Sequence, residues 1–284
     1  MVRLATRAWN DRAAPRPGGR RPLAVLVHGA ISSSRTWWRV APALVERGFE
    51  VLTVDLRGHG ASPRMTEGLG LSDLATDLVE TFQASVSASA PAAGAGEAPA
   101  ALLPPRIDLL LGHSLGALVA SQLLATRPGL ARRLVLEDPP GLSTTDWIAL
   151  ADGIEADGAR ARADPEGLRR DLLADSSGSP PEEAERRLAD LAECDAAGIA
   201  AALRRRVTYD LPGLMGSVHV PTLLLVGQES LGSALVEPDR SALVGALGRG
   251  TVEVLPAGHN LHREALDAFM AAIERWLGDD ARLD

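Results

Sequence analysis

The residues that most clearly suggest chemistry are a serine between two glycines, in the sequence GHSLG at residues 112–116. The apolar run IDLLL precedes this sequence, and the helical pattern LGALVASQLLATR overlaps its end and continues it. The pattern G-x-S-x-G between a strand and a helix predicts a tight turn that exposes the serine hydroxyl at the helix N-terminus. Backbone N–H groups at such a helix end point toward developing negative charge. Ser114 is therefore the candidate nucleophile.

A serine hydroxyl is a weak nucleophile and needs a base, for which the sequence offers six histidines. His259 lies in LPAGHNLHRE, in a loop after the last predicted strand, at the same sheet edge as Ser114. The chain order serine, acid, histidine favours His259 as the base. We expect His262 to lie inside the following helix, turned away from the site. The side chain of His113 should point away from that of Ser114.

The acid that would orient His259 through its second ring nitrogen is left open by the sequence. Glu229 is the nearest carboxylate after the predicted strand PTLLLVG, and a glutamate can fill this role. Asp138, in LVLEDPP after the preceding strand, is the rival candidate. Glu237 and Asp239 are less favoured because they lie at the start of a predicted helix, where acids also act as charge partners.

These residues must be positioned by a doubly wound, mostly parallel sheet, because short apolar runs alternate with helical patterns along the chain. The apolar runs are continuous, which is typical of strands covered on both faces. Strands are predicted at residues 23–30, 49–58, 107–114, 132–140, 221–230 and 250–259, and helices at 36–47, 72–82, 115–127, 238–247 and 261–277. Residues 2–9 and 11–19 are predicted to add antiparallel edge strands.

Two segments interrupt this alternation. Residues 83–105 are rich in Ala, Ser, Pro and Gly, which predicts a flexible surface loop. Residues 141–220 are rich in Arg, Glu, Asp, Ala and Leu, and Ser179, Pro180 and Glu182 fit the N-cap, N1 and N3 positions of a capping box. We expect a helical cap at 141–220 over the carboxyl edge of the sheet, between core segments 1–140 and 221–284.

Composition narrows the classes of function. The net charge is −8 and no basic stripe is present, which argues against nucleic acid and an anionic membrane surface as partners. The single cysteine, Cys194, excludes an internal disulfide. Neither a signal peptide nor an apolar membrane span is evident, so we expect a cytoplasmic monomer or homodimer. No metal-ligand spacing and no G-x-G-x-x-G pattern occurs, which predicts neither a metal nor a cofactor.

Four short sequences in order along the chain resemble the landmarks of the α/β-hydrolase superfamily: HGA at 28–30, DLRGHGAS at 55–62, GHSLG at 112–116 and AGHN at 257–260. The resemblance implies an oxyanion hole formed by the backbone N–H groups of Ala30 and Leu115. It also implies structural roles for Asp55, for the RGHG turn and for His28. The sequence departs from the family pattern at the acid, because no aspartate follows PTLLLVG until Asp239.

The residues favour a serine hydrolase that acts on an ester, lactone, thioester or activated amide through an acyl-enzyme. A serine in place of a nucleophilic carboxylate argues against epoxide hydrolases and haloalkane dehalogenases. Trp37, Trp147 and His113 are candidate substrate-binding residues, with Trp38 and Met215 as further possible lining, and they favour a small to medium apolar acyl group. Two alternatives stay open: a lyase, acyltransferase or C–C-cleaving enzyme on the same scaffold, and a non-catalytic ligand-binding protein.

Overall fold

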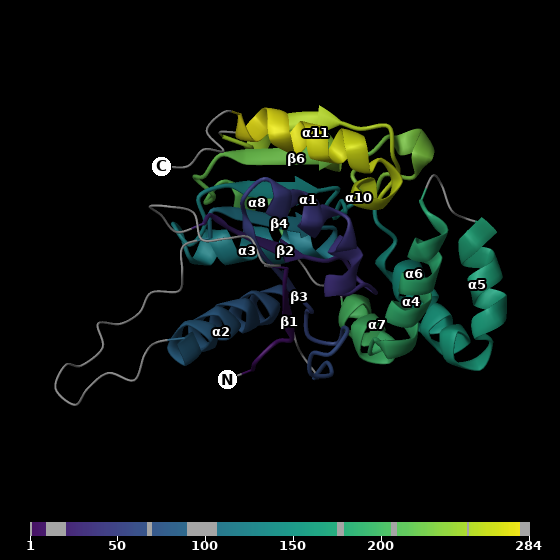
Figure 1. Ribbon diagram of the computed structural model, residues 1–284. Coiled ribbons are helices and arrows are strands. Elements are labelled where there is room, and N and C mark those ends of the chain that lie inside the picture. Colours follow the sequence, from purple (N-terminus) through teal and green to yellow (C-terminus); the bar gives the residue numbers. More distant parts are fainter. Residues whose placement is uncertain are drawn as a thin grey trace.

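A computed structural model describes residues 2–9, 21–66, 70–89, 107–174, 179–205, 209–248 and 250–278. Its described residues form a seven-stranded sheet in the order β1-β3-β2-β4-β5-β6-β7, in which every neighbouring pair is parallel except β1 with β3 (Figure 1). The strands are β1 (Thr6–Ala8), β2 (Leu23–Val27), β3 (Glu50–Val54), β4 (Leu109–His113), β5 (Leu134–Glu137), β6 (Thr222–Val226) and β7 (Gly250–Val254). The predicted doubly wound, mostly parallel fold is confirmed.

Helices cover both faces of the sheet, which explains why its central strands are apolar on both sides. One face packs against α1 (Val40–Glu46) and α11 (Leu266–Leu277). The other face packs against α2 (Leu71–Ser89), α3 (Leu115–Thr126), α8 (Leu211–Met215) and α9 (Asp239–Ala246). Strands β4 and β6 are buried at every residue. Parallel strands of this kind place all their carboxyl ends at one edge, where a site can be built.

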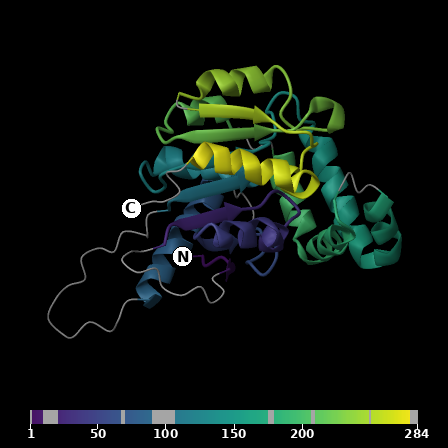
Figure 2. The same cartoon turned by 45° about the horizontal axis from the view of Figure 1, so that its top comes forward.

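Four helices between β5 and β6 stand beyond that carboxyl edge, on the right of Figure 1, and Figure 2 shows them from a second direction. They are α4 (Trp147–Ala163), α5 (Pro165–Ala174), α6 (Pro181–Glu193) and α7 (Ala196–Arg204), and we call them the helical insertion. They bury two small apolar clusters, one centred on α4 and α7 and one on α5 and α6. The next helix, α8, packs instead against α3 and α9 beside the sheet.

Several predicted element boundaries differ from the structure. The helix predicted over 36–47 is a 3₁₀ turn η1 (Ser34–Trp38) followed by α1, and the last helix is interrupted at Ala265, which separates α10 (Leu261–Glu264) from α11. Helix α2 continues to Ser89, so the start of the loop predicted at 83–105 is helical. Helix α6 begins at Pro181 with extended Pro180 as its N-cap, so the predicted cap at Ser179 is wrong by one residue.

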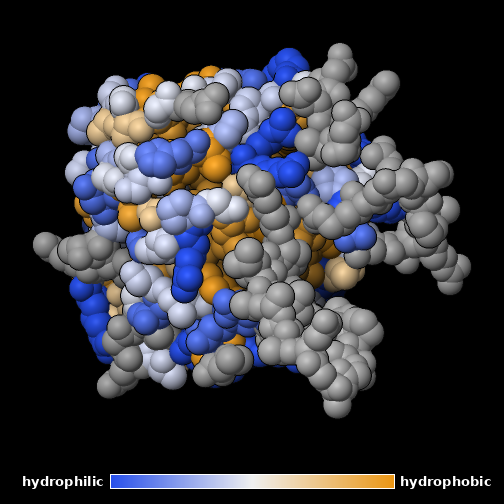
Figure 3. Space-filling model, turned by 90° about the vertical axis from the view of Figure 1, so that its left-hand side faces the viewer, coloured by the Kyte–Doolittle hydropathy of each residue, from blue (hydrophilic) through white to orange (hydrophobic). Residues whose placement is uncertain are grey.

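The opposite edge of the sheet, at the amino ends of the parallel strands, faces the viewer in Figure 3. On the left of this view hydrophilic residues predominate, and apolar residues lie nearer the centre. The predicted edge strand at 11–19 and most of the predicted loop at 83–105 lie outside the described residues. Among the described helices, none is both long and apolar enough to cross a membrane.

Candidate active site

The turn between β4 and α3 holds Ser114 in a strained backbone conformation, with φ 51° and ψ −117°. The flanking glycines are required by close packing: a Cβ at Gly112 would collide with the backbone of Gly116, and one at Gly116 would collide with the carbonyl of Val27. Non-glycine residues with positive φ are uncommon and concentrate at functional sites. Among the described residues three are found, Ile31, Ser114 and Asp138, and all three lie at this edge of the sheet.

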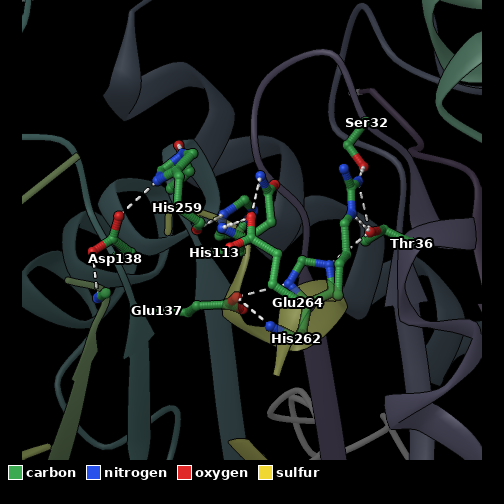
Figure 4. Close-up of polar contacts among 12 residues, drawn as sticks. Ser32, Thr36, His113, Glu137, Asp138, His259, His262 and Glu264 are labelled. Atoms are coloured by element: carbon green, nitrogen blue, oxygen red, sulfur yellow. Dashed lines mark hydrogen bonds and ion pairs between the residues drawn. The ribbon is translucent and has the colours of Figure 1, made fainter. Parts of the chain in front are cut away.

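His259 lies between Ser114 and Asp138 and contacts both. Its Nε2 is 3.0 Å from Ser114 Oγ, and its Nδ1 is 2.7 Å from Asp138 Oδ2 (Figure 4 shows the Asp138 contact). These three residues follow β4, β5 and β7, whose carboxyl ends meet at the same edge. A nucleophile, a base within hydrogen-bond distance and an acid that orients the base would have this geometry. Of the four candidate catalytic residues, the structure thus brings together Ser114, His259 and Asp138 and leaves Glu229 apart.

The two acid candidates, Asp138 and Glu229, differ in how far they are buried. Asp138 is fully buried, and besides His259 its carboxylate accepts hydrogen bonds from Gly227 N (3.1 Å), Ser233 Oγ (2.6 Å) and Ala234 N (2.7 Å). A carboxylate has acceptor positions for all four donors. Glu229 lies in the exposed 3₁₀ turn η2 (Glu229–Leu231), and it is Asp138, not Glu229, that contacts His259. The loop after β6 therefore supplies hydrogen-bond donors to Asp138, while its own carboxylate, Glu229, lies at the surface.

The loop after β2 lies against the Ser114 turn and is braced by two histidines. His59 Nε2 accepts the N–H of Ile31 at 3.2 Å, and His28 Nε2 accepts the N–H of Leu56 at 2.9 Å. Burial lowers the pKa of His28 to about 4 and that of His59 to about 3, so both act as neutral acceptors. The fold therefore holds this loop without charge on either ring.

The backbone N–H groups of Ala30 and Leu115 are among those at this edge that have no acceptor within the described residues. Leu115 is the first residue of α3, and Ala30 precedes the strained Ile31. Both residues line the same cavity as Ser114. Unpaired N–H groups at a helix start and a tight loop are suited to bind an oxyanion.

A cavity of about 360 Å³ opens above Ser114 and His259. The helical insertion forms one of its walls through Trp147, Leu150 and Ile154 of α4, Arg187 and Leu191 of α6, and Leu203 of α7. Its lining is mainly apolar, with Asp157, Arg187 and Arg263 as charged members. The cavity suits a largely apolar small molecule with a polar reacting group.

The predicted substrate-binding residues lie in different places. Trp147 lines the cavity and packs edge-on against Tyr209, at 5.7 Å between ring centroids. His113 also lines the cavity, and its ring lies 4.8 Å from that of His259. Trp37 is fully buried in the core, where it packs on the ring of His262 at 4.6 Å. The 3₁₀ turn η1 directs Trp37 inward, so it is not part of the cavity wall.

Sequence reasoning missed a buried polar cluster beneath His259. Glu137 and His262 are both buried and are hydrogen-bonded to each other, and Thr36 and Arg263 extend the cluster (Figure 4). His262 is the second residue of α10, so it lies inside the helix as expected, and its ring faces Glu137. The only signal in the sequence was a charged residue, Glu137, at the end of a buried strand. His113, Glu137 and His262 also lie close enough together to hold a metal ion, which no spacing in the sequence had indicated.

The model of the Alpha/beta hydrolase family matches residues 24–272. A serine hydrolase-like protein of Dictyostelium discoideum is 27% identical over 143 residues, which cover 50% of this chain and only 33% of that protein. An sn-1-specific diacylglycerol lipase, ABHD11 of Mus musculus, is 28% identical over 279 residues, covering 90% of this chain and 81% of the lipase.

Among solved structures, a hydrolase from Pseudomonas aeruginosa superimposes with a TM-score of 0.71 at 26% identity. The match covers 97% of this chain and 94% of the hydrolase. The family match spans nearly all of the sheet and every residue of the Ser114, Asp138 and His259 constellation. The chain belongs to the alpha/beta hydrolase family.

Proposed function

We propose that the protein is a serine hydrolase that cleaves a carboxylic ester or lactone with a small to medium apolar acyl group. The observation that carries this proposal is the continuous contact from Asp138 through His259 to Ser114 at the floor of an apolar cavity. A binding protein has no need for these two contacts. The similarity to a lipase adds support for an ester as the bond that is cleaved.

In the proposed mechanism Ser114 Oγ attacks the substrate carbonyl while its proton passes to His259 Nε2. Asp138 holds the ring through Nδ1 and stabilises the imidazolium that forms. The carbonyl oxygen becomes an oxyanion and accepts hydrogen bonds from the N–H groups of Ala30 and Leu115. His259 then protonates the leaving alkoxide, and the C–O bond breaks to give the acyl-enzyme and an alcohol.

Water completes the second half of the cycle. His259 takes a proton from the water, the hydroxide attacks the acyl carbon, and the proton returns to Ser114 Oγ as the carboxylic acid leaves. The side chains, the two backbone N–H groups, the substrate and water account for every bond and proton in these steps. We propose that the helical insertion acts as a cap, because its apolar wall would hold the acyl group and exclude bulk water.

Fluorophosphonate labelling tests the proposal directly. The intact mass of the wild type after labelling is compared with that of Ser114→Ala, and circular dichroism verifies that both are folded. We expect one adduct on the wild type and none on the variant, because only an activated serine is phosphonylated. A folded wild type that stays unlabelled by both a methyl and a decyl fluorophosphonate would refute the serine-hydrolase proposal.

A further inference from the structure

We propose that His113 and Glu137 are positioning residues that together hold the His259 loop in place. This inference rests on the proposed function. Each of the two residues directly precedes a member of the constellation: His113 precedes Ser114, and Glu137 precedes Asp138. They are also direct partners across the parallel strands β4 and β5. Two residues that are direct partners on adjacent strands point their side chains to the same face of the sheet.

The contact of His113 with the loop is a hydrogen bond to the backbone of the base itself. His113 Nε2 lies 3.0 Å from the carbonyl oxygen of His259. Burial lowers the pKa of His113 well below its usual range, so the ring carries one proton. Its Nδ1 is buried and has no partner among the described residues, and a carbonyl can only accept. The proton therefore resides on Nε2, where it is donated to His259.

Glu137 holds the other side of the loop. Its Oε1 accepts the backbone N–H of His262 at 2.9 Å and the ring Nδ1–H of His262 at 2.7 Å. The far ring nitrogen of His262 lies 2.7 Å from Thr36 Oγ1, which also accepts from Arg263 Nη2 at 2.8 Å. Glu137 and His262 are both almost completely shielded from solvent. Two strands thus bind the loop at residue 259 and at residue 262.

The consequence is that one pair of adjacent strands carries the nucleophile, the acid and both supports of the base. The Oγ–Nε2 and Nδ1–Oδ2 distances then depend on the pairing of β4 with β5, and paired strands keep a nearly constant spacing of about 4.8 Å. A displacement of about 1 Å in a reacting group lowers a rate by about 10²-fold. Loss of either support should therefore lower the rate of the chemical step more than it weakens substrate binding.

A metal ion held by His113, Glu137 and His262 is the competing explanation of the cluster. Four of the candidate ligand atoms already have hydrogen-bond partners in the protein: His113 Nε2, Glu137 Oε1 and both ring nitrogens of His262. The hydrogen-bonded arrangement keeps all of these contacts. A three-ligand metal site would have to break one of the two contacts of the His262 ring, with Glu137 or with Thr36, because both ring nitrogens are already paired. Metal analysis of the purified protein separates the two explanations.

The test compares two variants at residue 113. His113→Gln keeps an N–H donor near the position of Nε2, and His113→Met has similar length without a donor. Asp108→Asn is the control for the loss of a buried hydrogen bond far from the site. Like Glu137, Asp108 is a buried carboxylate that accepts a backbone N–H, from Leu23 at 2.8 Å, but it lies at the opposite edge of the sheet. Activity on p-nitrophenyl butyrate, thermal melting and the proton NMR signal of His259 Nδ1–H are measured for each.

For His113→Met we expect kcat to fall by about 10²-fold with KM changed less than threefold, and the downfield Nδ1–H signal to shift or broaden. His113→Gln should keep kcat within about fivefold of the wild type and retain the signal, and Asp108→Asn should change the melting temperature only. A Glu137→Gln variant, which keeps the acceptor oxygen, should lose less kcat than Glu137→Leu.

Three results would overturn the proposal. One is equal activity and an unchanged signal in the His113 Met and Gln variants. Another is a loss of kcat in Asp108→Asn as large as in His113→Met at the same loss of melting temperature. The third is one bound metal per wild-type chain that is absent from His113→Met. The NMR signal needs no turnover, so the positioning role is decided even if fluorophosphonate labelling refutes the proposed hydrolase.

Discussion

Replacing Asp138 by asparagine removes the charge that faces His259 while changing almost no volume. Asp138 Oδ2 accepts from His259 Nδ1 and Ala234 N, and Oδ1 accepts from Gly227 N and Ser233 Oγ. An asparagine side chain has one amide oxygen and one NH₂ group. In either orientation the NH₂ group faces a backbone N–H, of Ala234 or of Gly227, that then lacks an acceptor. One buried unpaired donor costs about 1–3 kcal/mol of folding free energy.

The expected effect on catalysis follows from the lost charge. In the transition state an imidazolium and a carboxylate would lie about 4 Å apart between charge centres, worth roughly 4 kcal/mol at an effective dielectric constant of about 20. That free energy corresponds to a rate decrease of about 10³-fold. If the ring also takes the wrong tautomer, the decrease reaches about 10⁴-fold. Substrate binding depends on the cavity wall, so KM should change little.

The assay measures kcat and KM for p-nitrophenyl butyrate in Asp138→Asn and in Glu229→Gln, with urea unfolding of both. Glu229 is exposed, so Glu229→Gln should keep kcat within about twofold and unfolding free energy within about 0.5 kcal/mol of the wild type. If Asp138→Asn keeps more than a tenth of the wild-type kcat, the assignment of the acid is refuted. A large loss in Glu229→Gln alone would identify the other carboxylate.

Three further predictions concern the cavity, the turn and the pH dependence of stability. Trp147→Ala removes a cavity wall, and KM for a hexanoate ester should rise about tenfold or more while KM for an acetate ester changes less than threefold, as steady-state kinetics would show. Gly116→Ala places a Cβ against the carbonyl of Val27, so the melting temperature should fall by 10 °C or more in a calorimeter, whereas a stable variant would contradict the packing. His59 is neutral when folded because its pKa is lowered from 6.5 to about 3, whereas the unfolded chain gains its proton below pH 6.5. Its contribution is complete above that pH and is lost as pH falls toward 3, so the wild type should lose about 1.4 kcal/mol more than His59→Gln between pH 8 and pH 5.5 in urea unfolding. Equal losses would refute the neutral buried ring.

The extent to which the site was predictable differs from residue to residue. Ser114 was predictable because G-x-S-x-G between an apolar run and a helix is a local pattern. His259 was predictable from its place after the last strand. The choice between Asp138 and Glu229 was not, because both follow strands that end at the same edge of the sheet. Only burial and the donors around Asp138 distinguish them.

The buried cluster is a clearer case of what tertiary structure decided. His113 and Glu137 are 24 positions apart along the chain, and no periodic pattern links them. They become neighbours because β4 and β5 pair in a register that sets His113 opposite Glu137. His262 meets Glu137 only because the chain after β7 returns across the carboxyl ends of both strands.

By itself the sequence determined the alternation of buried strands and helices, because continuous apolar runs can only be satisfied by cover on both faces of a sheet. It also determined the position of the candidate nucleophile, since the turn geometry depends on glycines only two residues away. Tertiary structure alone decided which carboxylate faces His259 and which helices line the cavity. It also decided which polar side chains hold the His259 loop. These outcomes depend on distances between segments far apart in the chain, and such distances arise only when the strands pair and the helices pack.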